Sequence, residues 1–163
     1  MTITDREVLT TGFAASPALA GDLQAVLVAL LELQSQAKQA HWTLVGPLFR
    51  ATHVALDEVV DAVREQADSV AERMRALEAV PDGRTRTVAE TSTLAGFPAG
   101  EVSVERAVAV VSERILAVVN IIRAVHDDVD SQDPTSADIL HGILEELEKQ
   151  RWMFTAQLRQ LPQ

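Results

Sequence analysis

The sequence contains no cysteine and no tyrosine, and it has only 7 glycines and 6 prolines among 163 residues. The absence of cysteine excludes disulfides, thiolate metal sites and cysteine nucleophiles, so any metal ligand must come from His, Asp or Glu. So few glycines and prolines, with abundant Ala, Val and Leu, disfavour a β-sandwich and favour long helices. With 47% hydrophobic residues, the chain is large enough for one domain with its own core.

Positive charge is also scarce, because 24 acidic residues outnumber 14 basic ones and give a formal net charge of −10. A negative surface attracts cations and repels phosphate backbones. The local basic groups are Arg73 with Arg75 and Arg84 with Arg86, so we expect DNA binding to be weak or absent. The first fifteen residues resemble no signal peptide, and the apolar runs are too short and interrupted to span a membrane. We therefore expect a soluble cytoplasmic protein.

Apolar residues recur at spacings of three and four in four long stretches, which predicts four helices. The expected ranges are 16–45, 47–77, 103–130 and 133–161. Residues 81–100 are expected to form a long connection with one short helix within 88–94. Two short connections and one long crossover are typical of ferritin-like bundles. The sequence therefore predicts an all-α, ferritin-like four-helix bundle over residues 16–160, preceded by an N-terminal arm of residues 1–15.

The second expected helix carries two pairs of potential metal ligands at the same spacing. His53 and Asp57 are four residues apart, as are Asp68 and Glu72, and all four project from one stripe of the helix. Asp57 and Asp68 are nevertheless about 16 Å apart along the axis, whereas metal–ligand bonds are about 2 Å. The pairs cannot share an ion within one chain. They can share one if two copies of the helix meet antiparallel across a twofold axis.

His41, near the end of the first expected helix, is a third kind of candidate. Two imidazoles and three carboxylates suit ferrous iron, zinc or manganese better than calcium or magnesium. The alternative is structural, since a His–Asp pair at helical spacing is commonly a surface hydrogen bond or a weak ion pair. No Glu-x-x-His sequence occurs, so the di-iron site found within one chain of ferritin bundles is not encoded.

Several segments together resemble one known family. Residues 38–49 read KQAHWTLVGPLF and are followed by His53 and Asp57; this arrangement resembles the Dps family of ferritin-like mini-ferritins. Further similar segments are DSVAER at 68–73, DPTSADIL at 133–140 and EKQRW at 148–152. The resemblance covers about residues 16–158, and the Arg-rich, Lys-poor usage is similar to actinobacterial members.

The resemblance implies a homododecameric shell with ferroxidase centres between subunits. His41, His53 and Asp57 would come from one subunit, and Asp68 and Glu72 from its neighbour. Iron is the implied metal, in a two-iron or mono-iron centre that also accommodates other divalent ions. The implied activity is oxidation of Fe²⁺ by hydrogen peroxide in preference to dioxygen, with storage of the ferric product as mineral. Such a protein protects the cell from oxidative damage.

The resemblance also assigns roles to three residues outside this set. It places Trp42 and Trp152 near the centre, where a tryptophan can donate an electron to an oxidising intermediate; the alternative is apolar packing. Asp138 matches the acidic position that lines the threefold pore for iron entry, although the helix dipole also favours a carboxylate there. Asp133 is expected to cap the last helix.

Two competing functions remain open from the sequence. One is a DNA-compacting nucleoid protein, which would place the chain at the nucleoid, but the tail after Leu158 offers only Arg159 as a basic group. The other is a metal-dependent hydrolase that activates water at the same site, although no separate general base is evident. His126 and His141 have no partners at ligand spacing and are expected to be ordinary surface or interface residues.

Overall fold

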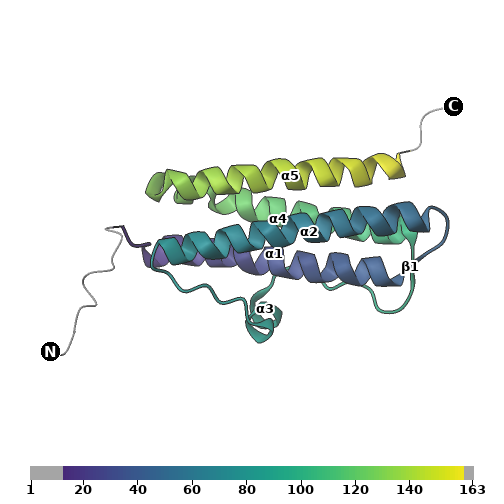
Figure 1. Cartoon of the computed structure of the whole chain (residues 1–163), viewed down its shortest axis with the longest axis horizontal. Helices are drawn as coiled ribbons and strands as arrows, with labels where there is room; N and C mark the ends of the chain where they lie inside the picture. The colour runs from purple at the N-terminus through teal and green to yellow at the C-terminus, as the bar shows by residue number, and fades with distance from the viewer. Residues whose placement is uncertain (1–12, 160–163) are drawn as a thin grey trace.

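Four long helices form an elongated bundle in the computed structural model, which describes residues 13–159 (Figure 1). The helices are α1 (Pro17–Thr43), α2 (Phe49–Ala76), α4 (Val104–Gln132) and α5 (Pro134–Leu158). Helix α1 packs against α2 and α4, and α5 packs against α4 and α2. The expected all-α, ferritin-like bundle with one long crossover is confirmed. The expected N-terminal arm lies mostly outside the described residues.

Side-chain caps set the starts of three long helices. Ser16, Ser103 and Asp133 each accept a hydrogen bond from the backbone N–H three residues later. Pro17 and Pro134 follow two of these caps, at a position where the missing N–H group of proline costs nothing. Because these signals are local, the sequence predicts the starts of these helices well.

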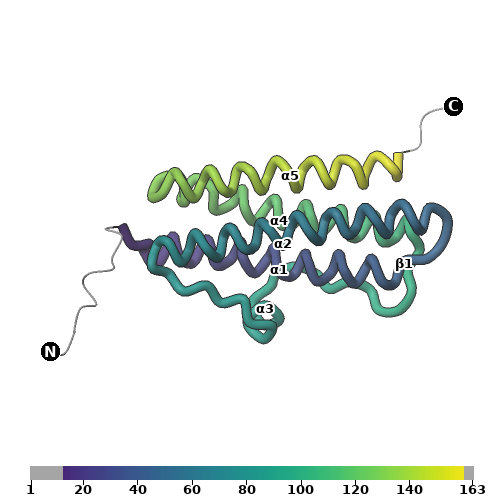
Figure 2. The backbone as a smooth tube through the Cα atoms, in the orientation of Figure 1, coloured from purple at the N-terminus to yellow at the C-terminus, as the bar shows by residue number. Residues whose placement is uncertain are grey.

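The end of α1 and the position of the short crossover helix differ from the expectation. The first helix ends at Thr43 because β1 (Leu44–Val45) pairs in parallel with β2 (Val102–Ser103). The short helix α3 spans Thr85–Thr91, three residues earlier than predicted. Figure 2 shows the crossover leaving α2, passing through α3 and reaching the opposite end of the bundle beside β1. The β1–β2 pair therefore joins the end of α1 to the start of α4.

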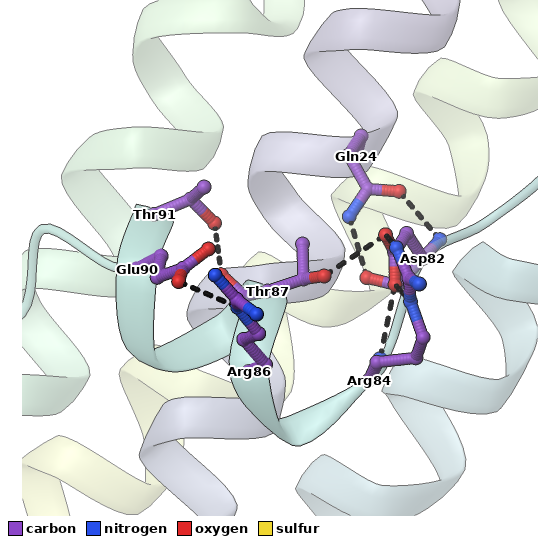
Figure 3. Close-up of polar contacts among 7 residues, drawn as sticks. All are labelled: Gln24, Asp82, Arg84, Arg86, Thr87, Glu90 and Thr91. Carbon is purple, nitrogen blue, oxygen red and sulfur yellow. Dashed lines mark hydrogen bonds and ion pairs between the residues drawn. The ribbon is translucent and has the colours of Figure 1, made fainter.

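Polar contacts fix the crossover to the bundle. Gln24 on α1 donates from Nε2 to the Asp82 carbonyl and accepts from the Asp82 N–H, at 2.9 and 2.8 Å (Figure 3). Further along, the buried Arg114 of α4 donates from Nε to the Ala95 carbonyl at 2.6 Å and from Nη2 to the Gly96 carbonyl at 3.4 Å. Side chains of α1 and α4 thus satisfy backbone groups of an otherwise irregular segment.

Helix α1 is the most apolar of the four long helices that the structure describes. By length and composition it is long enough to cross a membrane, which differs from the expectation that the apolar runs are too interrupted. Its side chains Leu19, Leu30 and Leu33 are fully buried between the neighbouring helices. The core position of α1 within the bundle accounts for this composition.

Candidate metal centre

His41 at the end of α1 and His53 in α2 hold each other in place. The Nδ1 atom of each ring lies 2.9 Å from the backbone carbonyl oxygen of the other residue, and the rings stack with centroids 3.5 Å apart. A carbonyl oxygen only accepts, so both Nδ1 atoms carry the proton and donate. Both Nε2 atoms therefore carry a free lone pair, which is the form of imidazole that binds metals.

The turn between the two helices makes this contact possible. Gly46 has a φ of 115° and Leu48 has a φ of 64°, so the chain reverses within a few residues and brings the start of α2 against the end of α1. The Phe49 ring at the start of α2 stacks on His53, with centroids 5.1 Å apart. Trp42, Leu48 and Phe49 remain exposed around the histidines.

Asp57 lies one turn beyond His53, and its carboxylate faces His41 and Lys38. The Asp57 Oδ1 atom accepts from Lys38 Nζ at 2.5 Å and lies 3.2 Å from His41 Nδ1. The hydrogen bond from Lys38, assisted by the positive charge of Lys38, lowers the pKa of Asp57 against the opposing effect of burial. The carboxylate is therefore ionised and able to bind a cation.

Lys38 was not expected to take part in this site. It lies three residues before His41, so both side chains share one face of α1. It is also one of only two lysines in the chain, the other being Lys149. The rarity of lysine in this sequence and the helical spacing of Lys38 from His41 are the two signals that could have identified Lys38.

Asp68 and Glu72 lie further along α2 and are both exposed. The helical rise puts Asp68 about 16 Å from Asp57. Within residues 13–159, no group of three or more His, Asp or Glu side chains is placed to hold a metal ion. Asp68 instead borders an open groove of about 690 Å³ that Asp61 and Glu65 also line. The structure thus brings His41, His53 and Asp57 together and leaves Asp68 and Glu72 apart, as the helical spacing predicts.

The two tryptophans point away from the core. The exposed fraction is 67% for Trp42 and 62% for Trp152, so packing inside this chain is not their role. Trp42 adjoins His41, and Trp152 lies on α5. Electron donation by either tryptophan stays a prediction.

Asp133 and Asp138 have different environments at the α4–α5 corner. Asp133 caps α5, as expected, and also forms an ion pair between its Oδ2 atom and Arg73 Nη2 at 2.6 Å. Burial opposes its ionisation, but the bonds from Ser136 and Arg73 outweigh burial and lower the pKa of Asp133. Asp138 is exposed, and its Oδ1 atom lies 3.7 Å from His141 Nδ1. A pore role for Asp138 stays a prediction.

The structure brings His126 and His141 into contact, which their spacing in the sequence does not predict. Their Nε2 atoms lie 2.6 Å apart, and their ring centroids lie 4.5 Å apart. The contact joins residues fifteen positions apart on two different helices. The i, i+3 and i, i+4 spacings that reveal pairs within one helix therefore cannot reveal it.

Two pairs of long helices joined by a single long crossover define the ferritin-like class. The family model described as a ferritin-like domain matches residues 21–163. Sequence relatives narrow the assignment from the ferritin-like class to one family within it. A DNA protection during starvation protein of Agrobacterium fabrum is 33% identical over 141 residues, which cover 86% of this chain and 87% of the relative.

Solved structures agree with the sequence relatives. The Dps of Microbacterium arborescens in a high-iron form has a TM-score of 0.82 and 33% identity, covering 90% of this chain and 98% of that one. DpsA14 of Streptomyces coelicolor has a TM-score of 0.85 and 31% identity, covering 93% and 94%. This chain belongs to the Dps family. At the level of the family it is an iron-sequestering mini-ferritin.

Proposed function

We propose that this chain oxidises Fe²⁺ at sites formed between two copies and stores the ferric product. Each site would take His41, His53 and Asp57 from one copy and Asp68 and Glu72 from the other. The observation that carries the proposal is the reciprocal bracing of His41 and His53, which engages both Nδ1 atoms and leaves both Nε2 atoms as the nitrogens that can bind iron. The ionised Asp57 carboxylate lies 3.2 Å from His41 Nδ1. Iron is the substrate and cargo of these residues.

The spacing along α2 supports a twofold arrangement. His53 and Glu72 are symmetric about the point between Ala62 and Val63, and Asp57 and Asp68 are symmetric about the same point. An antiparallel pair of α2 helices in this register places both pairs opposite each other at once, which generates two identical sites. A single register thus satisfies all four residues.

An apolar surface beside the histidines also supports a second copy. Trp42 is 67% exposed, Leu48 is 70% exposed and Phe49 is 43% exposed, and all three lie at the α1–α2 turn. Contiguous exposed apolar surface commonly marks a protein interface. Twelve copies in a closed shell are the assembly that membership of the family implies, and their carboxylates would give a strongly negative interior that attracts cations.

The proposed reaction balances with hydrogen peroxide as oxidant. Two Fe²⁺ ions each lose one electron, the O–O bond of one peroxide is cleaved, and uptake of two protons yields two waters and two Fe³⁺. Imidazole nitrogens and carboxylates suit Fe²⁺ and leave positions open for the oxidant. Oxidation in pairs avoids release of a hydroxyl radical. Dioxygen is the alternative oxidant, and the cytoplasm is the expected location.

The structure offers little support for the alternative of DNA binding. Arg84 pairs with Asp82 and Arg86 pairs with Glu90, as Figure 3 shows. Arg73 pairs with Asp133. Three of the four arginines that the sequence offers as a basic patch therefore already have carboxylate partners, which reduces the charge left for a phosphate backbone.

The test is anaerobic titration of metal-free protein with Fe²⁺, followed by stoichiometric peroxide. We expect one peroxide to be consumed per two Fe²⁺, ferric iron to migrate with the protein and trapped hydroxyl radical to fall. The Asp57→Ala/Glu72→Ala variant should lose this activity. Glu58→Ala, which changes the exposed neighbour of Asp57 on the same helix, should retain it. Unchanged iron oxidation in the double variant, or oxidation no faster than in protein-free buffer, would overturn the proposal.

A further inference from the structure

A second pair of histidines lies at the other end of the bundle from His41 and His53. His126 is 22 residues beyond Val104, the first residue of α4, which places it about 33 Å along that helix. The start of α4 adjoins the end of α1 through the β1–β2 pair. The contact between His126 and His141 is therefore separate from the site proposed for iron oxidation.

The protonation of His126 follows from its neighbour. Its Nδ1 atom lies 3.1 Å from Asp127 Oδ1, and an ionised carboxylate only accepts, so Nδ1 carries the proton. The Nε2 atom of His126 therefore presents a lone pair to His141 Nε2 at 2.6 Å. Two imidazole nitrogens this close need a hydrogen between them, so in the metal-free chain His141 Nε2 carries a proton and donates it to His126 Nε2.

We infer that a divalent transition-metal ion replaces this proton, chelated by Nε2 of His126 and Nε2 of His141. Bonds of about 2.0–2.1 Å in tetrahedral geometry separate two ligand nitrogens by about 3.3 Å. The rings must therefore move apart by about 0.7 Å relative to the present contact. His141 has a side chain 59% exposed and is free to turn, whereas the His126 side chain is only 19% exposed and is held by its helix.

The surrounding charge favours a cation at this pair. Asp127 contacts His126 and Asp138 contacts His141, and both carboxylates are almost fully exposed, so each can turn onto an ion or orient its imidazole. The nearest basic group on the same face of α4, Arg123, is paired with Glu148. Two imidazoles with carboxylates select zinc, copper, nickel or cobalt rather than calcium or magnesium.

Water or these exposed carboxylates would occupy the remaining coordination positions of the ion. In the described part of the chain, no three ligating side chains already converge. The site is thus an open two-histidine chelate with one carboxylate beside each imidazole. This arrangement differs from a closed structural zinc site, which has four protein ligands.

Calorimetric titration of the metal-free, full-length protein with Zn²⁺ tests the inference. The four histidines of the chain divide into two pairs, which supplies matched variants. His126→Asn/His141→Asn should lose one bound Zn²⁺ per chain, whereas His41→Asn/His53→Asn should retain that ion. Asp127→Asn should weaken its binding about tenfold, because the carboxylate orients the imidazole.

Two results would overturn the inference. One is an unchanged number of bound Zn²⁺ ions with unchanged affinity in His126→Asn/His141→Asn. The other is a wild-type protein whose bound Zn²⁺ is lost entirely in His41→Asn/His53→Asn. Circular dichroism of each metal-free variant confirms that it is folded. Since the measurement uses Zn²⁺ binding alone, failure of the iron-oxidation proposal leaves it unaffected.

Discussion

Lys38 Nζ donates to Asp57 Oδ1 at 2.5 Å, so an ammonium group occupies a carboxylate that is proposed to bind Fe²⁺. An incoming ion must displace this ammonium. We expect Lys38→Gln to bind Fe²⁺ more tightly, by about two- to fivefold, because a partly exposed ion pair of this kind contributes less than about 1 kcal/mol. Anaerobic calorimetry with Fe²⁺ measures the change.

The second lysine provides the control for this prediction. Lys149 pairs with Glu146 on its own helix, α5, and not with Asp57, so Lys149→Gln should bind Fe²⁺ as the wild type does. Weaker Fe²⁺ binding by Lys38→Gln would mean that the ammonium positions Asp57 rather than competing with iron.

Sharing of the site between subunits predicts complementation. His53→Ala and Glu72→Ala should each abolish iron oxidation alone, because every site lacks a ligand. In shells co-assembled from equal amounts of both variants, about a quarter of the sites receive His53 and Glu72 from intact halves. We therefore expect about a quarter of the wild-type rate, measured as peroxide-driven ferric absorbance.

A different mixture separates this mechanism from a general effect of co-assembly. His53→Ala mixed with Asp57→Ala damages the same half of every site and should restore nothing. Equal recovery in both mixtures would show that the two halves do not come from different chains.

The Arg73–Asp133 ion pair predicts a pH-dependent stability. The pKa of Asp133 is lowered in the folded chain, so its contribution is present above the unfolded pKa of about 3.9 and is lost as the pH falls below it. Asp133→Asn keeps a capping side chain but removes the charge. We expect a loss of about 1–3 kcal/mol at pH 7. Thermal unfolding at pH 7 and pH 3 should show the gap from wild type narrowing at the lower pH; a constant gap would contradict the assignment.

The hydrogen bonds from Arg114 to the crossover should contribute measurably to the stability of the chain. The buried guanidinium of Arg114 donates to the carbonyls of Ala95 and Gly96. Arg114→Leu removes both bonds and leaves Ala95 with only the bond from Gln36 Nε2. We expect about 2–3 kcal/mol of lost stability by chemical denaturation, with faster amide exchange in residues 92–101. Arg106→Leu, an exposed position on the same helix, should change little. Similar losses of stability in both variants would contradict the assignment of Arg114 as the residue that holds the crossover against α4.

Local signals explain which parts of the fold the sequence predicts. Ser16 and Asp133 cap helices beside prolines, so the starts of α1 and α5 are readable from two or three residues. Helix α3 lacks a side-chain cap at Arg84, and its predicted position is three residues late. The pairing of Leu44 with Val102 depends on residues far apart in the chain and has no periodic signal.

The candidate metal centre likewise combines features that local sequence spacing predicts with features that depend on distant residues. His53 and Asp57 are recognisable from helical spacing, and the distance to Asp68 follows from the helical rise. The reciprocal bonds between His41 and His53 depend on the conformation of the α1–α2 turn, which spacing alone does not give. The His126–His141 contact depends on the relative register of two helices and is invisible to any rule for a single helix.

The β1–β2 pair has a consequence for how the chain folds. The α1–α2 and α4–α5 pairs each join neighbouring segments through short turns and can form early, because local contacts close with little loss of chain entropy. Pairing of Leu44 with Val102 closes a much longer loop. We expect docking of the two hairpins, with closure of this strand pair, to be the slow step. All five candidate iron ligands, from His41 to Glu72, would then belong to the hairpin that leaves the ribosome first.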